Sequence, residues 1–332
     1  MHIACVGNAI LDALIAFSPA DLQEYSTDSA LTLPLGDKIL ISQSELQIGG
    51  NAANVSVGLS RLSHQASIFA EIGDDLLGRF IEQSLAQEQV DTKHVVKKGK
   101  TALDIVLNAQ IDRVILVDHQ KRSNEFVLPY ESLDGVYLTS LADNWENVYS
   151  QACEASKLHP LTIACNPGSV QLKEKERFLP FLPHITILIV NVQEAAQLIN
   201  HTEKVKKGES EKKTREYIRE LFTGLFSLGG SVVVITDGIA GSYAASKEDK
   251  KIYFCPTFGT PVVEKTGAGD AYATGFFASF LTGSPMEERL LSGTANGSSV
   301  VEHVGAQRGL LTAEEMIERK KLAKSPVEVL EL

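Results

Sequence analysis

The chain is short of cysteine, of basic residues and of long apolar runs. Its four cysteines, Cys5, Cys153, Cys165 and Cys255, form no C-x-x-C pair, which argues against a zinc knuckle or a disulfide framework and predicts reduced core thiols in a cytoplasmic protein. Only 31 basic residues stand against 42 acidic ones, a formal net charge of -11. Nucleic acids and anionic membranes are bound through basic patches, so neither is expected as the main partner. No run approaches the ~18 apolar residues needed to cross a bilayer.

Apolar segments alternate with amphipathic segments along most of the 332 residues. Strands buried on both faces are predicted at 2–7, 66–72, 135–138, 161–165, 185–190 and 231–236, and helices at 51–62, 76–87, 145–157, 194–200 and 211–226. This order predicts one α/β domain over residues 1–332, with helices on both faces of a central, mostly parallel sheet. Its ligands are expected beyond the carboxyl ends of the strands.

The most informative motif is Thr266-Gly267-Ala268-Gly269-Asp270, which stands before an apolar run that predicts a helix. Small residues allow backbone amides to converge on an anion, and the positive end of the helix dipole points to the same place. Asp270 would then lie beside a phosphate, where a carboxylate could accept a proton. A helix capped by Asp after a flexible turn gives the same pattern, so this motif alone leaves both interpretations open.

Two further motifs lie upstream. The pair Gly49-Gly50 opens a predicted helix that carries Asn51 and Asn54 in its first turns, where free amides can bind a polar ligand. The second motif, N-V-Q-E at 191–194, follows a predicted buried strand.

In order, spacing and context, the three motifs resemble the signatures of the PfkB (ribokinase-like) family of carbohydrate and nucleoside kinases. The resemblance covers essentially the whole chain. It implies a three-layer α/β/α sandwich with a small β-sheet lid, to which we assign segments 12–17, 38–48 and 101–118 because they alternate polar and apolar residues. It also implies a nucleotide-binding transferase that requires Mg²⁺ and moves the γ-phosphoryl group of ATP to a primary hydroxyl of a small sugar or related polyol.

The resemblance assigns functions to individual residues. Asp270 would be the general base, and the amides of Gly267, Ala268 and Gly269 would form an anion hole. The expected substrate-binding residues are Asp12, Gly50 and Asn54. The expected nucleotide-binding residues are Asn191, Thr236, Gly238, Gly241 and Asn296. Glu194 would hold Mg²⁺ through water, although Asn191 and Glu194 also fit an ordinary helix capping box.

One position departs from the family pattern, and another narrows the range of expected substrates. Glu264 replaces an aspartate that helps some members hold K⁺, which puts a potassium site in doubt. Asn51 stands where phosphosugar kinases often have lysine, which favours a neutral polyol. A nucleoside kinase, with Phe17 or Tyr137 beside the base, and a noncatalytic nucleotide or sugar sensor remain alternatives. The sequence leaves open which sugar or nucleoside is used, whether the lid closes, and whether a homodimer forms through the lid.

Overall fold

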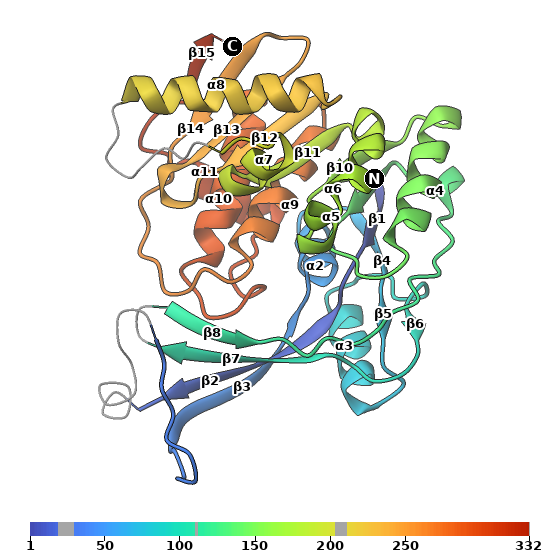
Figure 1. Cartoon of the computed structure of the whole chain (residues 1–332), viewed down its shortest axis with the longest axis vertical. Helices are drawn as coiled ribbons and strands as arrows, with labels where there is room; N and C mark the ends of the chain where they lie inside the picture. Colours follow the sequence, from blue (N-terminus) through green and yellow to red (C-terminus); the bar gives the residue numbers. More distant parts are fainter. Residues whose placement is uncertain (19–29, 110–111, 203–210, 332) are drawn as a thin grey trace.

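The computed structural model describes residues 1–18, 30–109, 112–202 and 211–331. Its central sheet contains parallel strands β1 (His2–Val6), β4 (Gln65–Phe69), β9 (Gly135–Leu138), β10 (Thr162–Cys165), β11 (Ile187–Asn191) and β12 (Val232–Thr236). Antiparallel strands β13 (Ser242–Ser246), β14 (Lys251–Cys255) and β15 (Glu328–Glu331) extend one edge. The nine strands are ordered β15-β14-β13-β12-β11-β10-β9-β1-β4 (Figure 1).

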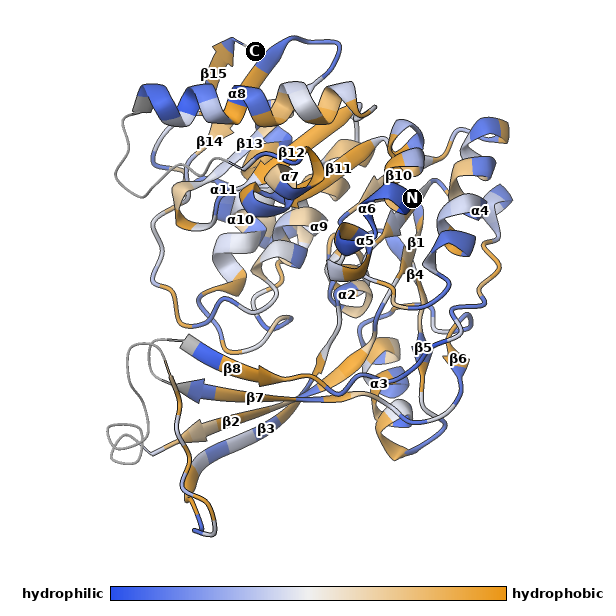
Figure 2. Ribbon diagram, in the orientation of Figure 1, coloured by the Kyte–Doolittle hydropathy of each residue, from blue (hydrophilic) through white to orange (hydrophobic). Residues whose placement is uncertain are grey.

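Helices cover both faces of this sheet. One layer contains α4 (Trp145–Leu158), α5 (Ser169–Lys173), α6 (Lys175–Phe178), α7 (Val192–Leu198) and α8 (Glu211–Ser227). The other contains α2 (Asn51–Arg61), α9 (Ala268–Leu281) and α10 (Met286–Val300), with α11 (Ala313–Lys320) packed on α10. Successive strand residues alternate between the two layers: Val136 and Leu138 face the first, and Tyr137 faces the second. Figure 2 shows the apolar central strands between more polar helix surfaces. The predicted three-layer α/β/α sandwich is confirmed.

A second sheet extends from one end of the main body (Figure 1). It contains β2 (Ile10–Phe17), β3 (Ile41–Gly49), β7 (Leu103–Ala109) and β8 (Asp112–Leu116), in the order β3-β2-β7-β8. These strands form where the alternating pattern predicted them, except that residues 110–111 lie outside the described part of the chain. A two-stranded sheet of β5 (Glu71–Ile72) and β6 (Val96–Lys97), together with α3 (Leu76–Gln87), lies at its base. Whether the second sheet works as a lid stays a prediction.

The sequence analysis did not predict the three antiparallel strands β13, β14 and β15 or the helices α10 and α11. The other differences are local. The strand predicted at 66–72 is divided, because β4 pairs with β1 whereas β5 pairs with β6. The helix predicted from Glu194 begins earlier, at Val192, because Asn191 caps it. All four cysteines are buried and free, and burial raises the thiol pKa of Cys153 to about 11. Each helix in the described part of the chain is too short or too polar to span a membrane.

Candidate active site

The N-terminus of α9 requires glycine. Gly267 is the N-cap and has a φ of 75°, and a Cβ atom there would lie 2.6 Å from Cα of Ala306. The helix begins at Ala268, so Asp270 lies in its first turn, where the helix dipole favours negative charge. At Gly269, by contrast, an added Cβ would meet no heavy atom within 4 Å, so this part of the first turn faces open space.

Asp270 is buried, with 7% of its surface exposed, and each of its oxygens accepts a hydrogen bond. Asn51 Nδ2 donates to Oδ1 at 2.9 Å, and Asn54 Nδ2 donates to Oδ2 at 2.8 Å. Burial raises the pKa of Asp270, and the two amide hydrogen bonds oppose this shift. The resemblance assigned Asn54 to the substrate, which stays a prediction. In the structure the side-chain amides of Asn54 and Asn51 both contact the carboxylate of Asp270.

The start of α2 brings these asparagines into place. Gly50, its N-cap, has a φ of 93°, and a Cβ atom there would lie 2.4 Å from the carbonyl oxygen of Asn8. This close approach fixes the helix start against the chain that leaves β1. Helices α2 and α9 pack together, with Gly58 against the side chain of Thr274. Their N-termini therefore meet at Asp270, although 216 residues separate it from Asn54.

Glu264 joins two loops beside this point. Its Oε1 accepts a hydrogen bond from the Thr266 hydroxyl at 2.6 Å, and its Oε2 accepts one from the Gly305 amide at 2.7 Å. The side chain is buried, with 8% exposed. The bond from Thr266 lies within the loop before α9, and the bond from Gly305 holds that loop against the loop after α10.

Asp12 lies within β2, in the segment 12–17 that the sequence analysis assigned to the small sheet. Its register partners are Gln47 on β3 and Asp104 on β7. Burial, and then the negative charges of Asp104 and Glu264, raise the pKa of Asp12 to about 6, while Arg113 opposes this shift. Its carboxylate occupies the space that a side chain at residue 49 would fill, next to the start of α2.

The N-V-Q-E motif forms the capping box that was its alternative interpretation. Asn191 Oδ1 accepts from the amides of Gln193 and Glu194 at 3.0 and 2.9 Å, and Glu194 Oε2 accepts from the Asn191 amide at 2.9 Å. Burial raises the pKa of the Glu194 carboxyl. Asn191 and Thr236 are register partners at the carboxyl ends of β11 and β12.

The glycines after β12 form a tight turn beside these strand ends. The amide of Asp237 donates to the carbonyl of Gly241 at 2.9 Å, and an added Cβ at Gly238 would meet no heavy atom within 4 Å. The segment from Thr236 to Gly241 thus presents backbone at the expected edge of the sheet.

Asn296 differs from the other predicted nucleotide-binding residues. It is fully buried; its Nδ2 donates to the Ala271 carbonyl at 2.8 Å, and its Oδ1 accepts from the Leu311 amide at 3.0 Å. Both ends of the amide are used to join α9, α10 and the segment before α11. This geometry favours a structural function over contact with a nucleotide, a distinction that the sequence could not make.

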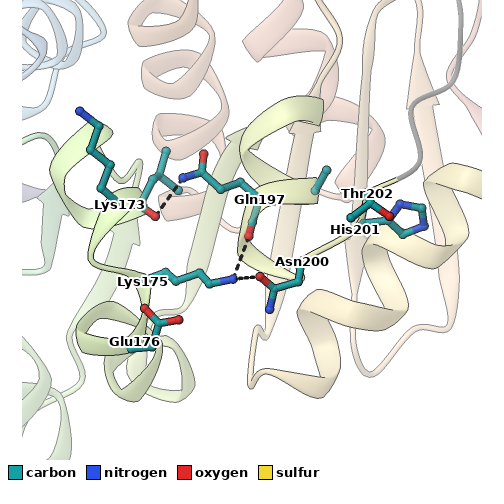
Figure 3. A pocket seen from close by; sticks show the side chains of 9 residues that line it. Lys173, Lys175, Glu176, Gln197, Asn200, His201 and Thr202 are labelled. Carbon is teal, nitrogen blue, oxygen red and sulfur yellow. Dashed lines mark hydrogen bonds between the residues drawn. The ribbon is translucent and has the colours of Figure 1, made fainter.

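A cavity of about 400 Å³ lies elsewhere, between α5, α6 and the end of α7 (Figure 3). Lys175 donates across it to the Gln197 carbonyl at 3.2 Å and to Asn200 Oδ1, and Lys173 points away from it. None of the residues predicted for the active site line it. Its polar groups are used to join two helices, so we do not assign it to the site.

Comparison with known proteins identifies the family of the chain. The model of the pfkB family carbohydrate kinases matches residues 3–313. The chain belongs to the pfkB family. It is a carbohydrate kinase and therefore an enzyme. This finding argues against the noncatalytic sensor that the sequence left as an alternative.

Members of the pfkB family with different substrates are similar to this chain. A 5-dehydro-2-deoxygluconokinase of Bacillus subtilis (strain 168) is 25% identical over 289 residues, 81% of this chain and 85% of the relative. A nucleoside kinase of Methanocaldococcus jannaschii is 24% identical over 326 residues, 96% of each chain. The crystal structure of ribokinase from Cryptococcus neoformans var. grubii in complex with ADP has a TM-score of 0.72 and 20% identity, covering 96% of this chain and 99% of that one. Membership of this kinase family implies that ATP is the co-substrate and that a divalent metal is typically needed.

Proposed function

We propose that this kinase transfers the γ-phosphoryl group of ATP to a primary hydroxyl of a small neutral sugar or related polyol, with Asp270 as general base. The observation that supports this most is the buried Asp270 carboxylate in the first turn of α9, which accepts hydrogen bonds from two side-chain amides of α2. In the reaction the hydroxyl oxygen forms a bond to the γ-phosphorus, the bond to the β-phosphate oxygen breaks, and ADP leaves. The hydroxyl proton passes to Asp270. Burial raises the pKa of Asp270, which makes it a stronger base.

The anion hole is proposed at the backbone of Gly267, Ala268 and Gly269. Amides in the first turn of a helix lack helical partners and, with the helix dipole, stabilise negative charge. The open space beside Gly269 leaves room for a phosphate group. Charge that spreads over the transferred phosphoryl group would be stabilised by these amides, which need no rearrangement during the reaction.

The nucleotide is proposed to lie along the carboxyl ends of β11 and β12, with Asn191, Thr236, Gly238 and Gly241 nearby. Within the described residues no group of three His, Cys, Asp or Glu side chains is arranged to hold a metal. Mg²⁺ suits such a place because it keeps several waters and is commonly bound by one or two carboxylates and the substrate phosphates. Glu194 is the carboxylate that fits, and bound Mg²⁺ would neutralise phosphate charge.

The acceptor is proposed to bind between Asp12 on the small sheet and the start of α2 at Gly50 and Asn54. A nucleoside kinase remains the alternative, because one relative bears that name. The two aromatic residues considered for a base slot argue against it. Tyr137 is fully buried against Phe277, and Phe17 is 6% exposed. A neutral sugar needs hydrogen-bonding groups rather than an aromatic slot.

Potassium is not part of the proposal. Glu264 replaces the aspartate of a potassium-binding pattern, and both of its oxygens already accept hydrogen bonds from Thr266 and Gly305. The bond from Gly305 joins the two loops that a cation would otherwise bridge.

The small sheet is proposed to act as a lid and as the surface of a homodimer. One row of apolar side chains crosses its four strands, from Leu46 through Ala13 and Ile105 to Leu116. Leu46 and Leu116 are 49% and 51% exposed, whereas most strand residues of the large sheet are buried. A second copy of the chain would cover this face. Light scattering should give the mass of a dimer for the native chain and that of a monomer for Leu46→Glu.

The proposed activity can be tested with purified protein, ATP and a panel of neutral sugars, polyols, nucleosides and one sugar phosphate. ADP release gives the rate, and NMR of the product gives the phosphorylated position. We expect turnover with a neutral sugar or polyol, phosphorylated at a primary hydroxyl. Turnover with nucleosides alone would favour the alternative, and no turnover with any acceptor would contradict the proposal.

A further inference from the structure

Gln307 connects the loop after α10 to the proposed base, and the reaction described above gives it no function. Its Nε2 donates to Asn54 Oδ1 at 3.0 Å, and Asn54 Nδ2 donates to Asp270 Oδ2 at 2.8 Å. Side chains from three distant segments thus form a chain of hydrogen bonds with one direction, which ends on the carboxylate.

The main chain of Gln307 is held by the helix that carries Asn54. Arg61 Nη1 donates to the carbonyl oxygens of Gln307 and Leu310 at 2.9 and 3.0 Å. Glu88 in turn holds Arg61 through two hydrogen bonds of 2.9 and 2.6 Å. Asn54 and Arg61 are seven residues apart on α2 and therefore lie on the same face. Helix α2 fixes Gln307 both by its side chain and by its backbone.

The direction of these bonds matters because the two ends of an asparagine amide have the same shape and opposite hydrogen-bonding character. The Gln307 donor takes the oxygen of Asn54 and leaves the NH₂ group to face Asp270. If the amide turned by half a rotation, its oxygen would lie against the carboxylate, acceptor against acceptor. Asn51 supplies a donor to the other Asp270 oxygen only. The Asn54 amide therefore has one favourable orientation, and Gln307 selects it.

We propose that Gln307 is a positioning residue of this kinase, which orients the Asn54 amide so that it donates to Asp270 and keeps the carboxylate ionised and in one orientation. The proposal rests on the proposed function of Asp270 as the base. Gln307 acts through Asn54 and contacts no reacting atom. The amide hydrogen bonds lower the pKa of Asp270 against the effect of burial, so their loss would raise it.

Other titratable groups near Asp270 determine how its pKa can be measured. Tyr137 of β9 is buried, and burial followed by the charge of Asp270 raises its pKa well above the usual range, so it stays protonated. Glu194 of α7 also has a raised pKa and would contribute to the acid limb of a rate profile. A direct signal from Asp270 is therefore needed beside the kinetics.

The test compares Gln307→Met with Gln197→Met, a matched control whose Nε2 donates to the Leu172 carbonyl at 3.0 Å beside the cavity of Figure 3. Gln307→Met should lower kcat about fivefold, the effect of one neutral hydrogen bond. It should leave KM for ATP unchanged and move the acid limb of kcat/KM to higher pH. Gln197→Met should change none of these values.

NMR titration of the ¹³C-labelled Asp270 carboxyl, assigned with Asp270→Asn, gives the pKa without turnover. We expect an upward shift in Gln307→Met and none in Gln197→Met. A folded Gln307→Met with unchanged titration and acid limb would overturn the proposal, even if its melting temperature fell. If Gln307→Met does not fold, Gln307→Glu is the second variant, because it keeps the shape of the side chain and adds negative charge. The proposal requires that Gln307→Glu raise the pKa of Asp270 above its value in the native chain. An upward shift in a chain that phosphorylates nothing would support the coupling and reject the proposed reaction.

Discussion

The two carboxylates of the proposed site have opposite surroundings. Asp270 lies in the first turn of a buried helix, and an amide donor faces each of its oxygens. Asp12 lies on the small sheet, directly opposite its register partner Asp104, with the charge of Glu264 nearby. The first carboxylate is held in one orientation, and the second carries repulsion that a ligand with hydroxyl donors would relieve. On the proposed assignment, the large sheet carries the base and the small sheet contributes to recognition of the acceptor.

Replacing the carboxylate on the large sheet should have the largest effect. Asp270→Asn removes the proton acceptor while keeping the volume, so we expect turnover to fall by at least ~10²-fold, the lower range for a general base. ATP affinity measured by calorimetry should stay near the native value. A variant with near-native turnover would show that another group accepts the proton.

Replacing the carboxylate on the small sheet should act on binding instead. Asp12→Ala should weaken sugar affinity by ~10–100-fold, because one or more charge-assisted hydrogen bonds to hydroxyls would be lost. Separate titrations with sugar and ATP measure this, and ATP affinity should stay nearly unchanged. Loss of ATP affinity with intact sugar affinity would show that Asp12 belongs to the nucleotide side of the site and not to the sugar side.

The same carboxylate predicts a pH dependence. Its pKa is raised from 3.8 to about 6, so it is largely protonated below about pH 6 and a poorer acceptor there. Sugar affinity of the native chain should therefore fall as the pH decreases through about 6. Asp12→Asn, which cannot titrate, should show no such fall.

Two glycines at the start of α9 test whether the backbone there is strained. Gly267→Ala should destabilise the protein by roughly 1–3 kcal/mol, since residue 267 has a positive φ and its Cβ would contact Ala306. Gly269→Ala, two residues later and within the helix, should leave stability equal or slightly higher, because alanine favours helices. Melting temperatures compare the two. If Gly269→Ala keeps stability and loses turnover, its open space holds the phosphate; equal melting temperatures for both would contradict the strained cap.

The smallest effect is expected at Glu194. Gln at this position can still complete the capping box with Asn191, so the melting temperature should hardly change. Loss of the charge should raise the Mg²⁺ concentration needed for half-maximal rate a few-fold. An unchanged metal titration would leave Glu194 with the capping function only.

The sequence predicted the six parallel strands of the large sheet and several of its helices, because strands buried on both faces and amphipathic helices have clear local patterns. It also predicted that residues 267–270 open a helix. It missed the antiparallel strands β13, β14 and β15 and the helices α10 and α11. The contacts around Asp270 were less visible. Asn51 and Asn54, three residues apart on α2, pointed to one helix face, but nothing local indicated that Asp270 would meet them. Glu264 stood out only as a departure from a pattern, and its bond to Gly305 joins loops 41 residues apart. Asn296 was assigned to the nucleotide by the resemblance alone, and the sequence could not show that both ends of its amide are bonded inside the fold.

The distance in sequence between Asn54 and Asp270 has a consequence for how the chain acquires activity. The two residues are 216 positions apart, and Gln307 follows only after a further helix. During synthesis, α2 leaves the ribosome long before α9 and α10 have been made. Until then its polar first turns have no partner helix and lie beside a partly assembled parallel sheet. A nascent chain that ends before residue 264 would hold Gly50, Asn51 and Asn54 without a base. Catalytic competence should therefore appear late and in one step, when about the last fifth of the chain docks onto a helix made at the beginning.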